Sequence, residues 1–188
     1  TVIAPGDPIE AEAATRAVAN WPGPCYLRLG RAGEPLVHKT PIDFRIGKAI
    51  TVQDGKDVTL VSTGSMLDTT MSVATRLLER GIRARVLSMH TIKPLDVEAV
   101  LTAARETRGV VTIEEHSIIG GLGSAVAEIR AETNTGNVLL TRMGLEPIFA
   151  TEAGDQNYLR QAFGLSPDSI FERVVRMLET TGKFQEPN

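Results

Sequence analysis

The chain of 188 residues has a single cysteine, Cys25, so it can form no disulfide bond within itself. Its formal net charge of −3 is small, and lysine and arginine are scattered rather than clustered. That pattern argues against a nucleic-acid-binding surface or a basic membrane patch. No apolar run approaches the ~20 residues that cross a bilayer, and the first residues lack the basic and then apolar pattern of a secretory signal. These absences predict a cytoplasmic protein that binds neither nucleic acid nor membrane.

Several catalytic motifs are missing as well. There is no H-E-x-x-H or C-x-x-C pair and no cluster of aspartates, so a metal site within this chain is not expected. The G-x-S-x-G turn of serine hydrolases and the lysine-containing phosphate loop of nucleotide triphosphatases are also absent. Of the three histidines, His38 is expected to be solvated, and His90 is expected in a loop, either an ordinary one or one that lines an interdomain face together with Lys93.

Strand-like and helical patterns alternate regularly between residues 46 and 182. Strands are predicted at 46–52, 58–62, 83–89, 109–113 and 138–143, with Asp54-Gly55 as turn chemistry after the first. Helices are predicted at 66–80, from Pro94 to about 101, and at 121–133, 155–163 and 167–180. This alternation predicts an α/β fold, a mainly parallel five-stranded sheet with helices on both faces.

The first part of the chain has a separate pattern. Thr1 to Ala4 read as the end of a strand, a helix follows to about residue 20, and residues 25–29 read as another strand. A βαβ unit of this size is too small for a domain, and the first residue is not Met, so we expect residues 1–31 to be the remnant of a longer α/β domain. Residues 32–45 are predicted to be a linker, residues 46–182 a domain, and residues 183–188 a frayed tail.

Residues 110–128 carry the most informative motif. An apolar run ends in Glu114-Glu115-His116, and a glycine-rich turn then leads into a helical pattern. Gly121-x-Gly123 is compatible with a phosphate cradle, but Val126 stands where a dinucleotide fingerprint needs its third glycine. The alternative is structural, because glycines permit a tight turn and a close approach of helix to sheet.

Four segments, in this order, resemble the C-terminal part of transketolases. They are residues 23–31 (GPCYLRLGR), 89–96 (MHTIKPLD), 114–128 (EEHSIIGGLGSAVAE) and 144–149 (GLEPIF) with Gly154. The resemblance covers nearly the whole chain. It implies that residues 1–31 are the end of a pyrimidine-binding domain and that residues 46–182 are the transketolase C-terminal domain.

Arg31 is the candidate ligand contact. It follows a strand and a glycine, and a guanidinium can meet two phosphate oxygens at once; the alternative from the residues alone is a solvated loop arginine. The resemblance, which includes Pro35 four residues later, implies that Arg31 binds the phosphate of the sugar substrate. Arg28 is expected to serve structure or a subunit contact.

Glu114, Glu115 and His116 form a candidate polar cluster at a strand end. Neighbouring acids and a histidine can handle protons because their pKa values shift one another. The favoured alternative is that they bind exposed loop N–H groups and fix the contact with a neighbouring domain. No residue of this chain is assigned a catalytic role.

The resemblance implies part of a thiamine-diphosphate-dependent enzyme of pentose phosphate metabolism, which moves a two-carbon ketol unit between sugar phosphates. It implies that thiamine diphosphate with Mg²⁺ or Ca²⁺ binds mainly to parts absent from this chain, which alone should be inactive. The implied partners are an N-terminal transketolase section or the missing domains, in a homodimer or heterotetramer. The alternatives are the β subunit of a 2-oxoacid dehydrogenase decarboxylase, deoxyxylulose-phosphate synthase, or a non-catalytic interaction module.

Overall fold

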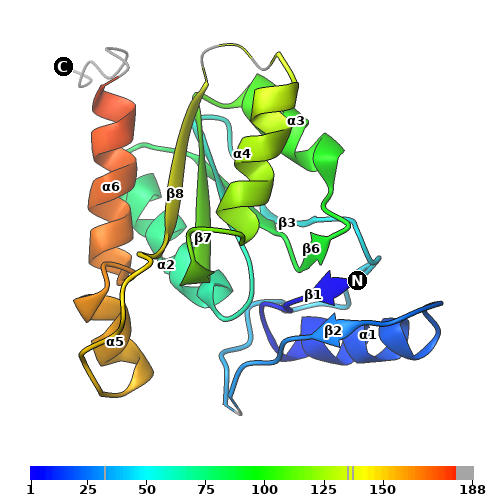
Figure 1. Ribbon diagram of the computed structural model, residues 1–188. Helices are drawn as coiled ribbons and strands as arrows, with labels where there is room; N and C mark the ends of the chain where they lie inside the picture. Colours follow the sequence, from blue (N-terminus) through cyan, green and yellow to red (C-terminus); the bar gives the residue numbers. More distant parts are fainter. Residues whose placement is uncertain (32, 135, 137, 181–188) are drawn as a thin grey trace.

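A five-stranded sheet forms the centre of the larger unit in the computed structural model, which describes residues 1–31, 33–134, 136 and 138–180 (Figure 1). The strand order is β3 (Ile50–Gln53), β5 (Ala84–Ser88), β4 (Val58–Ser62), β7 (Gly109–Ser117) and β8 (Leu139–Leu145). Neighbouring strands are parallel except β3, which pairs antiparallel with β5 at one edge. Every residue of β4 is buried, which its continuous run of apolar and β-branched residues favours in a sheet covered on both faces.

Helices cover both faces of this sheet (Figure 1). Helices α2 (Met66–Glu79) and α6 (Pro167–Glu179) share one core with Leu60 of β4, and α3 (Val97–Glu106) and α4 (Leu122–Glu132) share a second core with Val61. Adjacent strand residues therefore serve opposite cores, as the period of two in a strand requires. The predicted fold class, a mainly parallel five-stranded sheet between two helical layers, is confirmed.

The first residues form a βαβ unit. Strands β1 (Val2–Ile3) and β2 (Tyr26–Leu27) are parallel and are joined by α1 (Pro8–Ala19). The side chain of Asp7 caps α1 by accepting a hydrogen bond from the Glu10 amide at 2.8 Å. Strand β6 (Thr91–Lys93) adds to the other edge of β1, so the small sheet has the order β2-β1-β6 and joins both parts of the chain.

Several predicted boundaries were wrong. The strand expected at 46–52 begins only at Ile50, because Ile46 and Gly47 form a turn in which Gly47 has φ +83°. The strands on either side of the Asp54-Gly55 turn, β3 and β4, do not pair with each other, since β3 pairs with β5 instead. The helix expected from Pro94 begins at Val97, because residues 91–93 are drawn into β6 and Asp96 acts as the helix cap.

The remaining differences are smaller. Strand β7 runs on to Ser117, so Glu114, Glu115 and His116 lie within the strand. The strand expected at 25–29 is reduced to β2, and Cys25 just before it is half-buried. Helix α5 (Gln156–Ala162) forms as predicted, whereas the tail at 183–188 lies outside the described residues. No helix in the part that the structure describes is long and apolar enough to cross a membrane.

Candidate functional site

Arg31 lies in the loop after β2, with its side chain exposed. It lines a cavity of about 550 Å³. Ser65 and Thr69, at the start of α2, line the same cavity, and so do Gln156 and Arg160 of α5. In the described part of the chain the Arg31 side chain has no hydrogen bond or ion pair, so its donors are available to a ligand.

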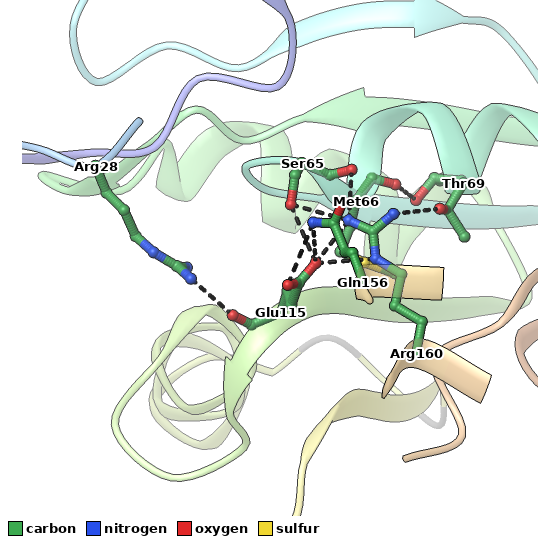
Figure 2. A network of polar contacts seen from close by, with 8 residues as sticks. Arg28, Ser65, Met66, Thr69, Glu115, Gln156 and Arg160 are labelled. Atoms are coloured by element: carbon green, nitrogen blue, oxygen red, sulfur yellow. Dashed lines mark hydrogen bonds and ion pairs between the residues drawn. The ribbon is translucent and has the colours of Figure 1, made fainter. Parts of the chain in front are cut away.

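Glu115 and Arg160 form the centre of a polar network beside this cavity (Figure 2). Arg160 donates from Nε at 2.9 Å and from Nη2 at 2.6 Å to Glu115 Oε2. The same carboxylate accepts from Ser65 Oγ at 3.2 Å and from Gln156 Nε2 at 3.1 Å. The Arg160 side chain is only 12% exposed, so the pair is shielded from water and holds α5 against β7.

The backbone of Glu115 makes a separate contact with the N-terminal unit. Its carbonyl oxygen accepts a hydrogen bond from Arg28 Nη2 at 3.0 Å (Figure 2). Arg28 is exposed and stands one residue after β2. This bond therefore joins the end of β2 to the end of β7, across the two units of the chain.

The Glu114 side chain lies on the opposite face of β7 from that of Glu115, because successive residues of a strand alternate between its faces. Its carboxylate accepts from the Leu122 amide at 2.8 Å and from the Gly123 amide at 2.7 Å, at the start of α4. Burial raises the pKa of the Glu114 carboxyl, and the two amides oppose this shift by stabilising the ionised form. Glu114 thus acts as the cap of α4, which has no cap of its own at Gly121.

This cap overturns the phosphate-cradle interpretation of Gly121-x-Gly123. The amides that a phosphate would need are already bound to Glu114, and a Cβ on Gly121 would overlap the same carboxylate. A Cβ on Gly123 would come within 2.9 Å of Thr112 Oγ1. The glycines therefore serve the close packing of α4 on the sheet.

His116 lowers the pKa of Glu114 electrostatically but makes no hydrogen bond to either acid in the described residues. Its side chain is exposed, and its Nδ1 lies 3.0 Å from the carbonyl of Ser117. Glu115 is committed to Arg160, and Glu114 to the amides of α4. The three consecutive residues thus have three different sets of contacts.

Glu34 is a further acid in the lining of the cavity, and sequence reasoning missed it. A Cβ on Gly30 would come within 2.5 Å of Glu34 Oε1, so the absence of a side chain at Gly30 makes room for this carboxyl. Burial raises the pKa of Glu34, Arg160 lowers it, and the carboxylates of Glu115 and Asp68 raise it again. The shift favours the neutral acid near Arg31.

His38 was expected to be solvated, and this is wrong. Its side chain is 7% exposed, and its Nε2 lies 2.8 Å from Oε1 of the fully buried Glu10. Glu10 raises the pKa of His38 through this hydrogen bond, and burial opposes the shift. Asp7 also accepts from the amides of Val37 at 3.1 Å and His38 at 2.9 Å, so the segment after Arg31 is fastened to α1.

His90 lies in the short loop between β5 and β6, as expected, and is fully buried there. Its ring stacks on Phe44 with 4.0 Å between centroids, and its Nδ1 lies 2.9 Å from Thr91 Oγ1. Burial lowers the pKa of His90, which favours a neutral ring. Lys93, in contrast, is exposed at the end of β6.

The acidic and histidine side chains do not fit a metal-bound diphosphate. Within the described ranges no three His, Cys, Asp or Glu side chains are grouped so that they could hold a metal ion. The buried acids already have partners in the chain. Glu10 contacts His38, Asp7 accepts from backbone amides, and Glu114 accepts from the amides of α4.

Comparison with known families decides the identity of this fold. Residues 47–170 match the family model for the transketolase C-terminal domain. The chain belongs to the transketolase C-terminal domain family. The resemblance that the four sequence segments indicated is confirmed.

Individual relatives of this transketolase C-terminal chain agree with the family model. It is 41% identical over 179 residues to the 6-deoxy-6-sulfo-D-fructose transketolase subunit SqwH of Clostridium sp. (strain MSTE9), covering 95% of this chain and 55% of that protein. It is 40% identical over 179 residues to an apulose-4-phosphate transketolase subunit of Phocaeicola vulgatus, covering 95% of this chain and 56% of that protein. The chain thus spans about half the length of these relatives.

A solved structure gives the same result for the fold. A protein described as a split gene transketolase, in an inactive beta4 tetramer, superimposes with a TM-score of 0.85 and 37% sequence identity. The match covers 95% of this chain and 57% of that one.

Proposed function

We propose that this chain is the C-terminal part of a thiamine-diphosphate-dependent, transketolase-like enzyme that transfers a two-carbon ketol unit from a ketose phosphate to an aldose phosphate. Family membership supports the enzyme class, and two relatives are named as subunits of transketolases. The observation that carries the substrate assignment is Arg31, whose exposed guanidinium lines a cavity of about 550 Å³ without a partner in the described part of the chain. A phosphate needs such an uncommitted donor fork.

The contrast with neighbouring arginines supports this role for Arg31. Arg28 is bonded to the Glu115 carbonyl, and Arg160 is paired with the Glu115 carboxylate. Arg31 also lies beside Glu34, whose raised pKa reduces negative charge where an anion would bind.

Thiamine diphosphate, when bound, supplies the carbanion chemistry that breaks and forms the carbon–carbon bond. Since the acids and histidines described here do not fit its metal-bound diphosphate, we propose that the remaining section of the enzyme binds it, with Mg²⁺ or Ca²⁺. The chain then contributes substrate binding and assembly, and by itself is inactive. We propose a homodimer or a heterotetramer with an N-terminal transketolase section, in the cytoplasm and without nucleic-acid or membrane partners.

The division of the chain follows from the same proposal. We propose that residues 1–31 complete a pyrimidine-binding domain and that residues 46–182 form the C-terminal domain, of which 47–170 match the family model. Residues 32–45 then form the linker. In the structure this segment is fastened to α1 through Asp7 and Glu10, so it fixes the relative position of the two parts.

The test is Arg31→Ala in the complete enzyme, assembled from this chain and the remaining section. Loss of a charge-assisted, two-pronged phosphate contact costs about 2–3 kcal/mol, so KM for a ketose phosphate should rise about 30- to 150-fold. KM for the matching free ketose should not change, and Arg31→Lys should restore part of the loss because it keeps the charge without the fork. Arg45→Ala, which removes an exposed arginine paired with Asp43 in the linker, is the matched control. Equal losses for both sugars would make Arg31 structural and refute the assignment.

A further inference from the structure

The segment that carries Arg31 is held at two points and has no helix or strand of its own. Before it, the Arg28 amide donates to the Ile3 carbonyl at 2.8 Å, and the Arg28 side chain donates to the Glu115 carbonyl at 3.0 Å. After it, the amides of Val37 and His38 donate to Asp7. Between these points the described residues of 29–36 form neither helix nor strand, and Gly33 has φ +96°. The location of the Arg31 guanidinium therefore depends on where these two attachments lie.

The side-chain part of the first attachment depends on the end of β7. Glu115 lies near the last residue of that strand, where Ser117 pairs with Leu145 after an irregular register. Its side chain is held by two bonds from Arg160, which also donates to the Ser65 carbonyl at 3.2 Å (Figure 2). The pair thus connects α5, β7 and the start of α2 at Glu115, the residue whose carbonyl oxygen accepts the hydrogen bond from Arg28.

We propose that Glu115 and Arg160 are positioning residues that set the affinity of Arg31 for phosphorylated substrates, a role that rests on the function proposed above. They act through the contact of Arg28 with the Glu115 carbonyl. Arg160 lines the same cavity as Arg31, but its guanidinium is neutralised by the Glu115 carboxylate, so it contributes little attraction of its own to an anion. The C-terminal domain thereby determines substrate specificity through residues that do not touch the substrate.

Glu115→Gln in the complete enzyme tests this directly, because it keeps the side-chain shape and the backbone carbonyl but removes the charge that holds Arg160. The change also frees the positive charge of Arg160, but a misplacement of about 1 Å can cost up to 100-fold, and we expect this loss to outweigh that gain. KM for a ketose phosphate and the inhibition constant of inorganic phosphate should then rise about tenfold. KM for the free ketose and kcat should not change. Arg160→Lys, which keeps the charge and loses the fork, should give a smaller rise of about threefold.

The matched control is Glu106→Gln. Its carboxylate pairs with Arg85 Nη2 at 2.7 Å, and that pair is also half shielded from water. It lies at the amino ends of the strands, since Arg85 is the second residue of β5, whereas Glu115 lies near the carboxyl end of β7. This variant should leave both sugars unaffected.

The Arg31→Ala background separates the possible outcomes. If Glu115→Gln acts through Arg31, it adds no further phosphate-selective loss there. A full additional loss in that background would mean that Glu115 acts independently of Arg31, and it would overturn the positioning role. A gain in phosphate affinity for Glu115→Gln would mean that the released Arg160 binds the anion itself, and it would overturn that role too. A phosphate-selective loss for Arg31→Ala with none for Glu115→Gln or Arg160→Lys would overturn this inference and leave the proposed function intact. No selective loss for Arg31→Ala would refute the proposed function itself.

If Glu115→Gln fails to assemble, as thermal unfolding would show, the effect of Arg160→Lys on KM for the ketose phosphate decides between these outcomes.

Discussion

Glu114→Gln should destabilise the fold, because the Glu114 carboxylate is the acceptor for two buried amides. Oε2 accepts from Leu122 at 2.8 Å and Oε1 from Gly123 at 2.7 Å, and the residue is 2% exposed. Glutamine has the same shape but only one oxygen, so its NH₂ group would face one of the two N–H donors. The change also removes a negative group from the start of α4, where the helix dipole favours one.

The magnitude follows from three contributions. A buried N–H left without an acceptor costs about 1–3 kcal/mol, and the lost interaction with the helix dipole adds about 0.3–1 kcal/mol. Burial raises the pKa of Glu114, so the ionised carboxylate is itself costly to bury, and glutamine removes that cost. We expect a net loss of about 2 kcal/mol for glutamine, and of about 3–4 kcal/mol for alanine, which leaves both amides unpaired and opens a cavity.

The assay is the free energy of unfolding in urea, with Glu128→Gln as the control. Glu128 is an exposed residue of the same helix, so its change should stay within about 0.5 kcal/mol. Since the pKa of Glu114 in the folded chain lies above its ordinary value of 4.5, its contribution is largest below that pH and decreases as pH rises through the raised pKa. The gap between the unfolding free energies of wild type and Glu114→Gln should therefore narrow as pH rises from below 4.5 through the raised pKa. A loss no larger than the control's would refute the reasoning.

Three further predictions concern pH, cofactor and association. The pKa of His38 lies above its ordinary value of 6.5, so the stability from its pairing with Glu10 is complete below that pH and is lost as pH rises through the raised pKa. The midpoint temperature of thermal unfolding of the wild type should fall over that range. If the midpoint temperature of His38→Gln fell equally steeply with pH, the assignment would be contradicted. Calorimetry of this chain alone with thiamine diphosphate and Mg²⁺ should show no site with a Kd of about 1 μM or tighter, and such a site would refute the division of roles. The chain alone should also self-associate, because Phe149 is 97% and Ile148 is 68% exposed; light scattering that shows only monomer at high concentration would argue against this.

The sequence by itself determined the fold class, because hydrophobic periodicity is a local property. The continuous apolar run of β4 and the apolar spacing of α2 and α6 indicated a buried sheet between helices, and the structure has both layers. Some of the boundaries that failed were set by pairing with distant segments. Residues 91–93 stand directly before Pro94, where a helix was expected to start, and they pair with Val2 and Ile3 as β6.

Only the tertiary structure decided what the candidate site residues contact. Glu114 and Glu115 are adjacent in sequence, yet strand alternation sends one to the amides of α4 and the other to Arg160, 45 positions later. No local pattern identified Arg160 or the buried partner of His38, because neither belongs to a motif. The difference has a physical cause: periodicity reports which face of an element is buried, whereas an ion pair depends on which side chains the packed elements bring within about 3 Å of one another.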